Sequence, residues 1–187
     1  GLQQPDSGTV AIGEGGRPQL VFQDAGASLT PWLSVGEHLE ERLRSEGFTA
    51  SERAERAREV LALVGLPISV LGLRARQLSG GQRQRVAIAR AIAVPPALLA
   101  CDEPISALDV SLAGAVLNLL CRLRAELGMA MLFVTHDLSV ARLVGDRVAV
   151  MHAGRIVEEG PPEAVLDSPQ HPQTQDLVAS IPRLRSA

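Results

Sequence analysis

The segment LSGGQRQRVAIARAIAVPPALLACDEPISALD spans residues Leu78 to Asp109 and indicates the fold class. Apolar residues at helical spacing follow a glycine pair near its start, and two consecutive prolines then end that helix. A continuous apolar run comes next and ends in two acids, Asp102 and Glu103. A helix followed by a buried strand with acids at its carboxyl end is typical of a parallel α/β sheet.

The rest of the chain continues this alternation of strands and helices around a helical insertion. Apolar runs predict the strands, and stripes of apolar residues at helical spacing predict the helices. The second helix of the insertion is expected to be capped by Ser51. The predicted elements are strands at 19–23, 97–101 and 129–135, helices at 34–43, 51–64, 82–94 and 113–127, a hairpin at 148–151 and 155–157, and short helices after 162 and near 174.

Composition limits the classes of protein that this chain can belong to. Its 187 residues are 46% hydrophobic, enough for one large globular domain or two small ones. A net charge of -3 gives no electrostatic support for a nucleic-acid partner. No uninterrupted apolar run reaches the roughly 18 residues of a membrane span. A role at a membrane is therefore expected to come through a partner protein.

Basic residues and cysteines carry no motif by themselves. Arg83, Arg85 and Arg90 are expected to form one solvated helix face. Cys101 and Cys121 have neither metal-ligand nor disulfide spacing, so both are expected to be buried, small apolar residues.

The helix start at 79–82 is a candidate anion site. Ser79, Gly80, Gly81 and Gln82 stand where backbone N–H groups and the positive end of the helix dipole face outward. The glycines would let a phosphate approach the backbone closely. Taken alone, such a start is usually only a loop and a cap.

The acidic pair is a candidate catalytic site. Asp102 and Glu103 stand at the carboxyl end of a buried strand, where α/β sheets bind ligands. Asp102 could hold Mg²⁺, and Glu103 could polarise a water that attacks a γ-phosphate. An isolated Asp-Glu-Pro triplet would more often be a polar turn, but the glycine motif just before it favours the catalytic interpretation.

Two further polar residues end predicted strands. His136 follows the strand at 129–135 and could donate a hydrogen bond to a terminal phosphate. Gln23 ends the strand at 19–23 and offers an amide oxygen to Mg²⁺ or to the attacking water. The other histidines, His38, His152 and His171, are interpreted as structural.

Taken together and in this order, these motifs resemble the nucleotide-binding domain of ABC transporters, over nearly the whole chain. The resemblance implies that Gln23 is the Q-loop glutamine and that Ser79 to Gln82 contact the γ-phosphate of ATP bound to an opposing subunit. It implies further that Asp102 is the Walker B aspartate, Glu103 the catalytic base and His136 the switch histidine. The D-loop is then the segment from 106 to Asp109. ATP and Mg²⁺ are the implied cofactors.

The resemblance also implies a fold and an organisation. The fold class is α/β: a partial P-loop NTPase (RecA-like) parallel sheet, an α-helical ABC subdomain and a short C-terminal extension. The expected parts of this one nucleotide-binding domain are core strands and Q-loop at 1–30, the helical subdomain at 31–80, the Walker B, D-loop and switch-histidine core at 81–155, and the extension at 156–187.

Segments outside these motifs resemble the oligopeptide, dipeptide and nickel importer branch of the family. They are Val21 to Asp24 with Ala27 to Pro31, and the tail segments at 154–160 and 169–174. The implied partners are transmembrane permease subunits, a second ATP-binding subunit that is identical or paralogous, and indirectly a solute-binding protein. The implied location is peripheral, at the cytoplasmic face of the cell membrane.

All 18 basic residues are arginines, so no Gly-x-x-x-x-Gly-Lys-Ser/Thr loop exists in this sequence. The start at Gly1 resembles the stretch that follows this Walker A loop in the family, so we expect the gene to continue upstream. Three functions stay open: the ATPase of an importer, a remnant that docks or dimerises without hydrolysis, and a soluble ABC ATPase of DNA repair or translation. The absence of coiled-coil insertions weakens the third.

Trp32 is the only tryptophan of the chain. The resemblance places its segment, 28–39, beside the Q-loop in the groove that receives a permease helix. An exposed tryptophan there would be an anchor residue. The alternative is a partly buried residue in the core of the helical lobe.

Overall fold

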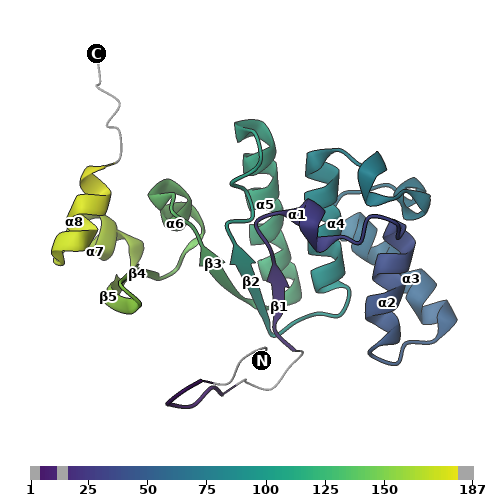
Figure 1. Cartoon of the computed structure of the whole chain (residues 1–187), viewed down its shortest axis with the longest axis horizontal. Helices are drawn as coiled ribbons and strands as arrows, with labels where there is room; N and C mark the ends of the chain where they lie inside the picture. Colours follow the sequence, from purple (N-terminus) through teal and green to yellow (C-terminus); the bar gives the residue numbers. More distant parts are fainter. Residues whose placement is uncertain (1–4, 12–16, 181–187) are drawn as a thin grey trace. The chain divides into compact units, whose positions relative to one another are not determined.

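A computed structural model describes residues 5–11 and 17–180 of the chain, and its elements alternate as the sequence predicts (Figure 1). Residues 1–4, which begin the stretch that resembles the segment after a Walker A loop, lie outside the described residues. Residues 181–187, which end the expected extension, lie outside them too. In chain order the elements are β1 (Gln19–Val21), α1 (Ala25–Ser28), α2 (Val35–Arg44), α3 (Ala50–Leu63), η1 (Ile68–Gly72), η2 (Ala75–Gln77), α4 (Gly80–Ile92), β2 (Leu98–Asp102), α5 (Val110–Leu127), β3 (Ala130–Val134), α6 (Leu138–Val144), β4 (Val148–His152), β5 (Arg155–Gly160), α7 (Pro162–Asp167) and α8 (Pro172–Ala179).

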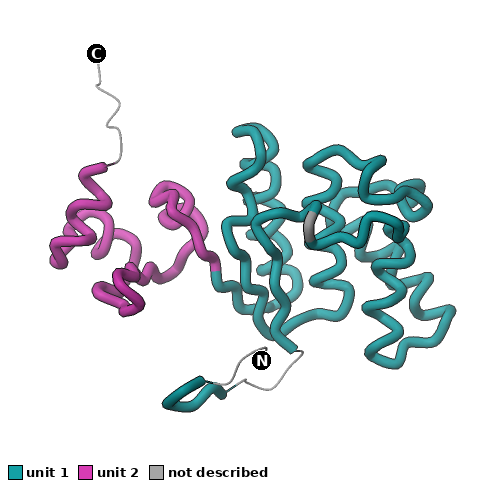
Figure 2. Tube along the Cα trace, in the orientation of Figure 1, with its two compact units in different colours: residues 1–132 teal, residues 133–187 magenta. Residues whose placement is uncertain are grey.

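The chain divides into two compact units, residues 1–132 and 133–187 (Figure 2). The first unit contains the helical lobe and the strands that precede the predicted acidic pair. The second contains the β4–β5 hairpin and the last three helices.

A sheet in the order β1-β2-β3 confirms the predicted α/β class. β1 and β2 are parallel, and Val21 lies opposite Cys101 in their register. Both residues are buried on one face, and helix α4 packs against β1. Leu20 alternates with Val21 and is 44% exposed, so the other face of β1 is open.

The second unit has a small core of its own. β4 and β5 pair antiparallel, as predicted, and two valines of β4 pack against helix α7. The Glu158 carboxylate of β5 accepts the backbone N–H groups of Gln170 and His171, at 2.9 and 3.0 Å. This carboxylate therefore fixes the turn that leads into α8, and the His171 ring caps that helix by accepting the Gln173 N–H.

Helix caps set boundaries that the apolar pattern alone misplaced. Helix α3 is capped by Thr49, not by Ser51, because the Thr49 hydroxyl and the Glu52 carboxylate form a reciprocal capping box. Helix α5 begins at Val110, three residues before the predicted start at 113, because the Asp109 carboxylate accepts the Leu112 N–H at 2.9 Å.

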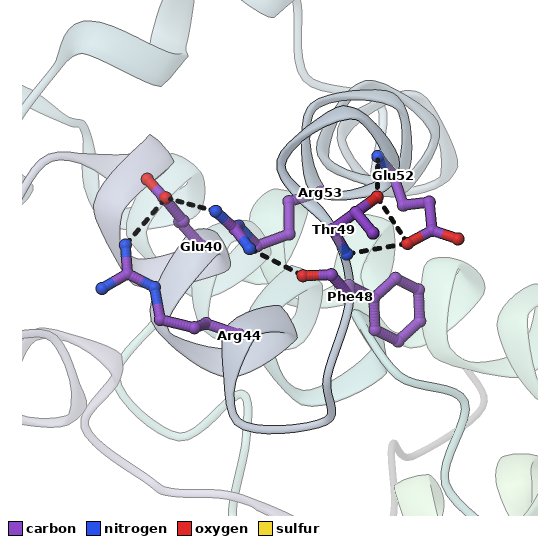
Figure 3. Close-up of polar contacts among 6 residues, drawn as sticks. All are labelled: Glu40, Arg44, Phe48, Thr49, Glu52 and Arg53. Atoms are coloured by element: carbon purple, nitrogen blue, oxygen red, sulfur yellow. Dashed lines mark hydrogen bonds and ion pairs between the residues drawn. The ribbon is translucent and has the colours of Figure 1, made fainter.

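Charged groups tie the two long helices of the lobe together (Figure 3). Arg53 of α3 donates to the Glu40 carboxylate of α2 at 3.2 Å and to the Phe48 carbonyl at 2.6 Å. Glu40 also accepts from Arg44 one turn along its own helix, at 2.9 Å. One carboxylate therefore holds two guanidinium groups and fixes α2 against the start of α3.

The expected solvated face of Arg83, Arg85 and Arg90 is wrong. All three are partly buried, and each donates to a backbone carbonyl: Arg83 to Leu78, Arg85 to Val64 and Arg90 to Ser28, at 2.8, 2.8 and 3.1 Å. A guanidinium can reach a carbonyl at a helix end while its aliphatic stem stays packed. Arg85 and Arg90 therefore attach α4 to the ends of α3 and α1, whereas Arg83 holds the segment that leads into α4.

The prediction for the two cysteines holds for one of them. Cys101 is fully buried, and burial raises the pKa of its thiol to about 12. Cys121 is exposed, because the buried face of α5 is made by its valine and leucine residues at 116, 117, 119, 120 and 123. Cys121 falls on the opposite face of that helix.

Candidate functional site

Gln23 and Glu103 meet at the carboxyl edge of the sheet. The Gln23 amide Nε2 donates to the Glu103 carboxylate Oε2 at 3.2 Å. The register explains the contact, since Val21 lies opposite Cys101 and each polar residue follows two positions later. Two residues that are 80 positions apart in the chain are therefore brought into direct contact.

Glu103 has an unusual backbone. Its φ of +43° lies in the left-handed region, which costs free energy for any residue with a Cβ. The turn is held by Ser106, whose N–H and hydroxyl both donate to the Glu103 carbonyl, at 3.2 and 3.0 Å. Strained backbone of this kind is concentrated at active sites and ligand clamps. The catalytic role of Glu103 stays a prediction, because Ala153 in the β4–β5 turn has a similar φ of +46°.

Asp102 is the last residue of β2 and is exposed. The oxygen atoms of Asp102 and Gln23 are hard ligands of the kind that Mg²⁺ prefers. Among the described residues, no group of three or more His, Cys, Asp or Glu side chains could hold a metal. A nucleotide-bound Mg²⁺ uses one or two carboxylates together with phosphates and water. Asp102 and Gln23 would then be its protein ligands.

The predicted anion site forms the start of α4. Its N-cap Ser79 accepts the Gln82 N–H at 3.2 Å, and the Gln82 side chain accepts the Ser79 N–H at 2.9 Å. The two glycines differ in their surroundings. A Cβ on Gly81 would lie 3.1 Å from the Leu112 side chain of α5, whereas one on Gly80 would meet open space. A side chain at 81 would therefore need the Leu112 side chain to shift, whereas Gly80 leaves the surface open to a ligand.

The remaining predicted residues lie at helix starts. Asp109 is exposed and caps α5, and this structural role is additional to the predicted nucleotide contact. His136 is exposed and lies two residues after the end of β3, next to the cap of α6. It belongs to the second unit, whereas the other predicted site residues belong to the first.

Sequence reasoning missed the contacts between helix α4 and the segment after Gln23. Arg90 donates to the Ser28 carbonyl at the end of α1, and the Arg83 guanidinium Nε would lie 3.8 Å from a Cβ on Gly26. The signal available in the sequence was the spacing of seven between the two arginines, which places them on one helix face. Helix α4 thus connects the predicted anion site to the Q-loop segment.

Trp32 is 71% exposed, in the loop between α1 and α2. The interpretation as a core residue is therefore wrong. His38 of α2 lies beneath this loop, is 1% exposed, and has its ring Nε2 3.2 Å from the Thr30 carbonyl. The expectation that His38 is structural agrees with this burial.

Comparisons with known proteins identify what the chain is similar to. A family model described as ABC transporter matches residues 1–106. Two relatives, from Brucella abortus and Brucella ovis, are named as peptide import ATP-binding proteins, and each is 47% identical to this chain. The matches cover 90% and 89% of this chain and 51% and 53% of the relatives. The chain thus spans about half the length of these relatives.

Two solved structures share the fold. CbiO1 from Clostridium perfringens, part of the ABC transporter complex cbiONQ, superposes with a TM-score of 0.73 at 30% identity, over 81% of this chain and 59% of that one. A dimeric ATP-binding cassette in a post-hydrolysis state, bound to ADP and Pi, gives 0.67 at 35% identity, over 79% and 63%. Among the described residues, no helix is long and apolar enough to cross a membrane.

Proposed function

We propose that this chain, which belongs to the ABC transporter family, is part of the ATP-hydrolysing subunit of an importer of peptides or of a related solute such as nickel. The contact between Gln23 and Glu103 carries the proposal, because it joins the ends of two strands at the ligand-binding edge of the sheet. The names of the relatives support the choice of peptides.

Each site residue has a proposed role. Glu103 accepts a proton from the water that attacks the γ-phosphate, and Gln23 orients that water and offers its amide oxygen to Mg²⁺. Asp102 holds Mg²⁺, which supplies charge neutralisation to the phosphates when it is bound. His136 donates a hydrogen bond to the terminal phosphate.

The start of α4 is proposed to act on the nucleotide of a second ATP-binding subunit. Ser79, Gly80 and Gln82 present the positive end of a helix dipole at an exposed surface, and Asp109 lies at the start of the adjacent helix. Permease subunits, and through them a solute-binding protein, complete the proposed assembly at the cytoplasmic face of the membrane. The four parts expected at 1–30, 31–80, 81–155 and 156–187 remain part of this proposal.

One observation favours a second candidate function. The sequence has no lysine, so this chain by itself holds no Walker A loop. A chain that docks on a partner or dimerises without hydrolysis would keep the same fold.

A chimera separates the two candidates. The part of the Brucella abortus relative that precedes the segment matched by this chain would be joined to it, and the chimera would be reconstituted with a peptide permease and its binding protein. Peptide uptake that depends on ATP and is lost in a Glu103→Gln variant is the expected result. A stable chimera that binds the permease but neither hydrolyses ATP nor supports uptake would favour the second candidate.

Trp32 gives a test of the permease surface. Replacing Trp32 by alanine in the chimera should weaken association with the permease by tenfold or more, since an exposed tryptophan anchor typically contributes about 2 kcal/mol or more. Basal ATP binding should be unchanged. Co-purification with the permease, at several concentrations of chimera, measures the loss. Phe48→Ala, in the lobe but away from this loop, is the control; equal effects of both variants would contradict the assignment.

A further inference from the structure

We propose that His38 is a proton-sensitive tether for the loop that carries Trp32. The tether is the hydrogen bond from the His38 ring to the Thr30 carbonyl, at 3.2 Å. The same carbonyl accepts the Leu33 N–H at 3.1 Å, so both bonds close the turn that presents Trp32.

The geometry selects one neutral tautomer of His38. A carbonyl oxygen only accepts, so Nε2 must carry the proton that is donated to Thr30. The other ring nitrogen, Nδ1, is then an unprotonated acceptor. It is buried, and no polar atom of the described residues is its hydrogen-bond partner. A proton added there would have no acceptor, which is costly for a buried charged group.

Burial is the largest influence on the pKa of His38 and lowers it below its ordinary value. The hydrogen bond to the Thr30 carbonyl acts in the opposite direction, and Arg90 of α4 adds to the lowering, so the pKa stays lowered on balance. Glu37 and Glu41 of α2 favour the charged form, but both are exposed, and Glu37 already accepts from the Ser34 N–H and hydroxyl. The segments 25–34 and 68–72 contribute no charged side chain, and Arg53 of α3 is held by Glu40 and the Phe48 carbonyl.

The direction of the response follows from linkage. In the closed state of the loop the hydrogen bond between His38 and Thr30 is formed, and in the open state it is broken and His38 is in water. A histidine whose pKa is lowered in the closed state binds a proton more weakly there than in the open state. The closed loop is therefore fully favoured above the ordinary pKa of about 6.5 and is progressively lost as the pH falls below it. The protonated His38 ring can be hydrated only if it leaves its buried site. The Thr30 carbonyl then loses one of its two hydrogen-bond donors. A weaker anchor surface for a permease at acidic pH rests in addition on the proposed function.

The 187-residue chain carries its own reporters for the test. The exchange rate of the Leu33 amide, corrected for the intrinsic effect of pH, should give a protection factor that falls about tenfold per pH unit below about 6.5. Fluorescence anisotropy of Trp32 should fall over the same range, and the signal is clean because the chain has no tyrosine and no other tryptophan. Far-UV circular dichroism should stay constant.

Variants decide whether His38 is the responsible group. His38→Gln keeps an amide donor for Thr30 but does not titrate, so its protection factor should stay high and flat with pH. His38→Ala should show low protection at every pH. His152→Gln, at an exposed position, should respond as the unmodified chain does. The proposal is overturned if the unmodified chain shows no change down to about pH 5, or if His38→Gln keeps the full response. Neither result depends on permease binding, so failure here is distinct from failure of the proposed function.

Discussion

In the chimera, Glu103→Gln should bind ATP and leave it uncleaved, and the ATP-loaded dimer should accumulate. Glutamine keeps the shape of the side chain and can still hydrogen bond to Gln23, but it cannot accept a proton from the attacking water. Loss of a general base typically lowers the rate by a factor of about a hundred to ten thousand. Single-turnover hydrolysis measures this deficit, and size-exclusion chromatography with ATP reports the dimer.

Asp102→Asn is the matched variant, because it removes the neighbouring charge. If Asp102 holds Mg²⁺, the variant should lose Mg²⁺-dependent nucleotide affinity together with turnover, and no dimer should accumulate. Near-normal hydrolysis by Glu103→Gln would show that the base is elsewhere. A dimer trapped by Asp102→Asn instead would show that the two roles are exchanged.

The 187-residue chain by itself should hydrolyse ATP at the background rate and bind Mg-ATP very weakly. A Walker A loop surrounds the phosphates with backbone N–H groups and a lysine, and this chain has no lysine to serve them. Joining the part of the relative that precedes the matched segment should raise turnover by several orders of magnitude, in line with typical enzymatic accelerations of about a millionfold or more. A nucleotide titration and a phosphate-release assay on both proteins make the comparison.

The control for this comparison is the chimera with its Walker A lysine changed to alanine. It should behave like the 187-residue chain in both assays. Micromolar binding with turnover by the chain itself would instead mean that the chain forms a phosphate site without a Walker A loop. Gln23 and Glu103 would then be the first residues to replace, to test whether they belong to that site.

The sequence predicted the main elements because they are built on local patterns. The run before Asp102 is apolar, so its strand was evident, and the glycine pair with the proline stop outlined helix α4. Strand β1 ends at Val21, before the predicted end at Gln23, and the Gln23 side chain hydrogen bonds to Glu103. That hydrogen bond joins distant parts of the chain, so no local pattern contains it.

The site was predictable as a set of residues but not as a geometry. Motif order placed Gln23 and Glu103 on one edge, whereas the positive φ of Glu103 follows from the turn that Ser106 holds. The environments of Trp32 and Cys121 were not predictable, because one aromatic in a loop has no periodicity and a cysteine suits both faces of a helix. Arg90 was misjudged because its partner, the Ser28 carbonyl, is 62 positions away.

The open face of β1 bears on how this chain behaves in solution. Leu20 is 44% exposed and Leu132 of β3 is 56% exposed, and apolar side chains that remain uncovered promote self-association. Association through such a face grows with protein concentration and with kosmotropic salts, and it is indifferent to nucleotide. Pairing through the start of α4 would instead require ATP. A dimer that forms without nucleotide and is removed by a Leu20→Ser substitution would therefore be nonspecific association through the apolar face of the sheet. Only the ATP-dependent fraction of dimer would then be counted as the paired state of the subunit.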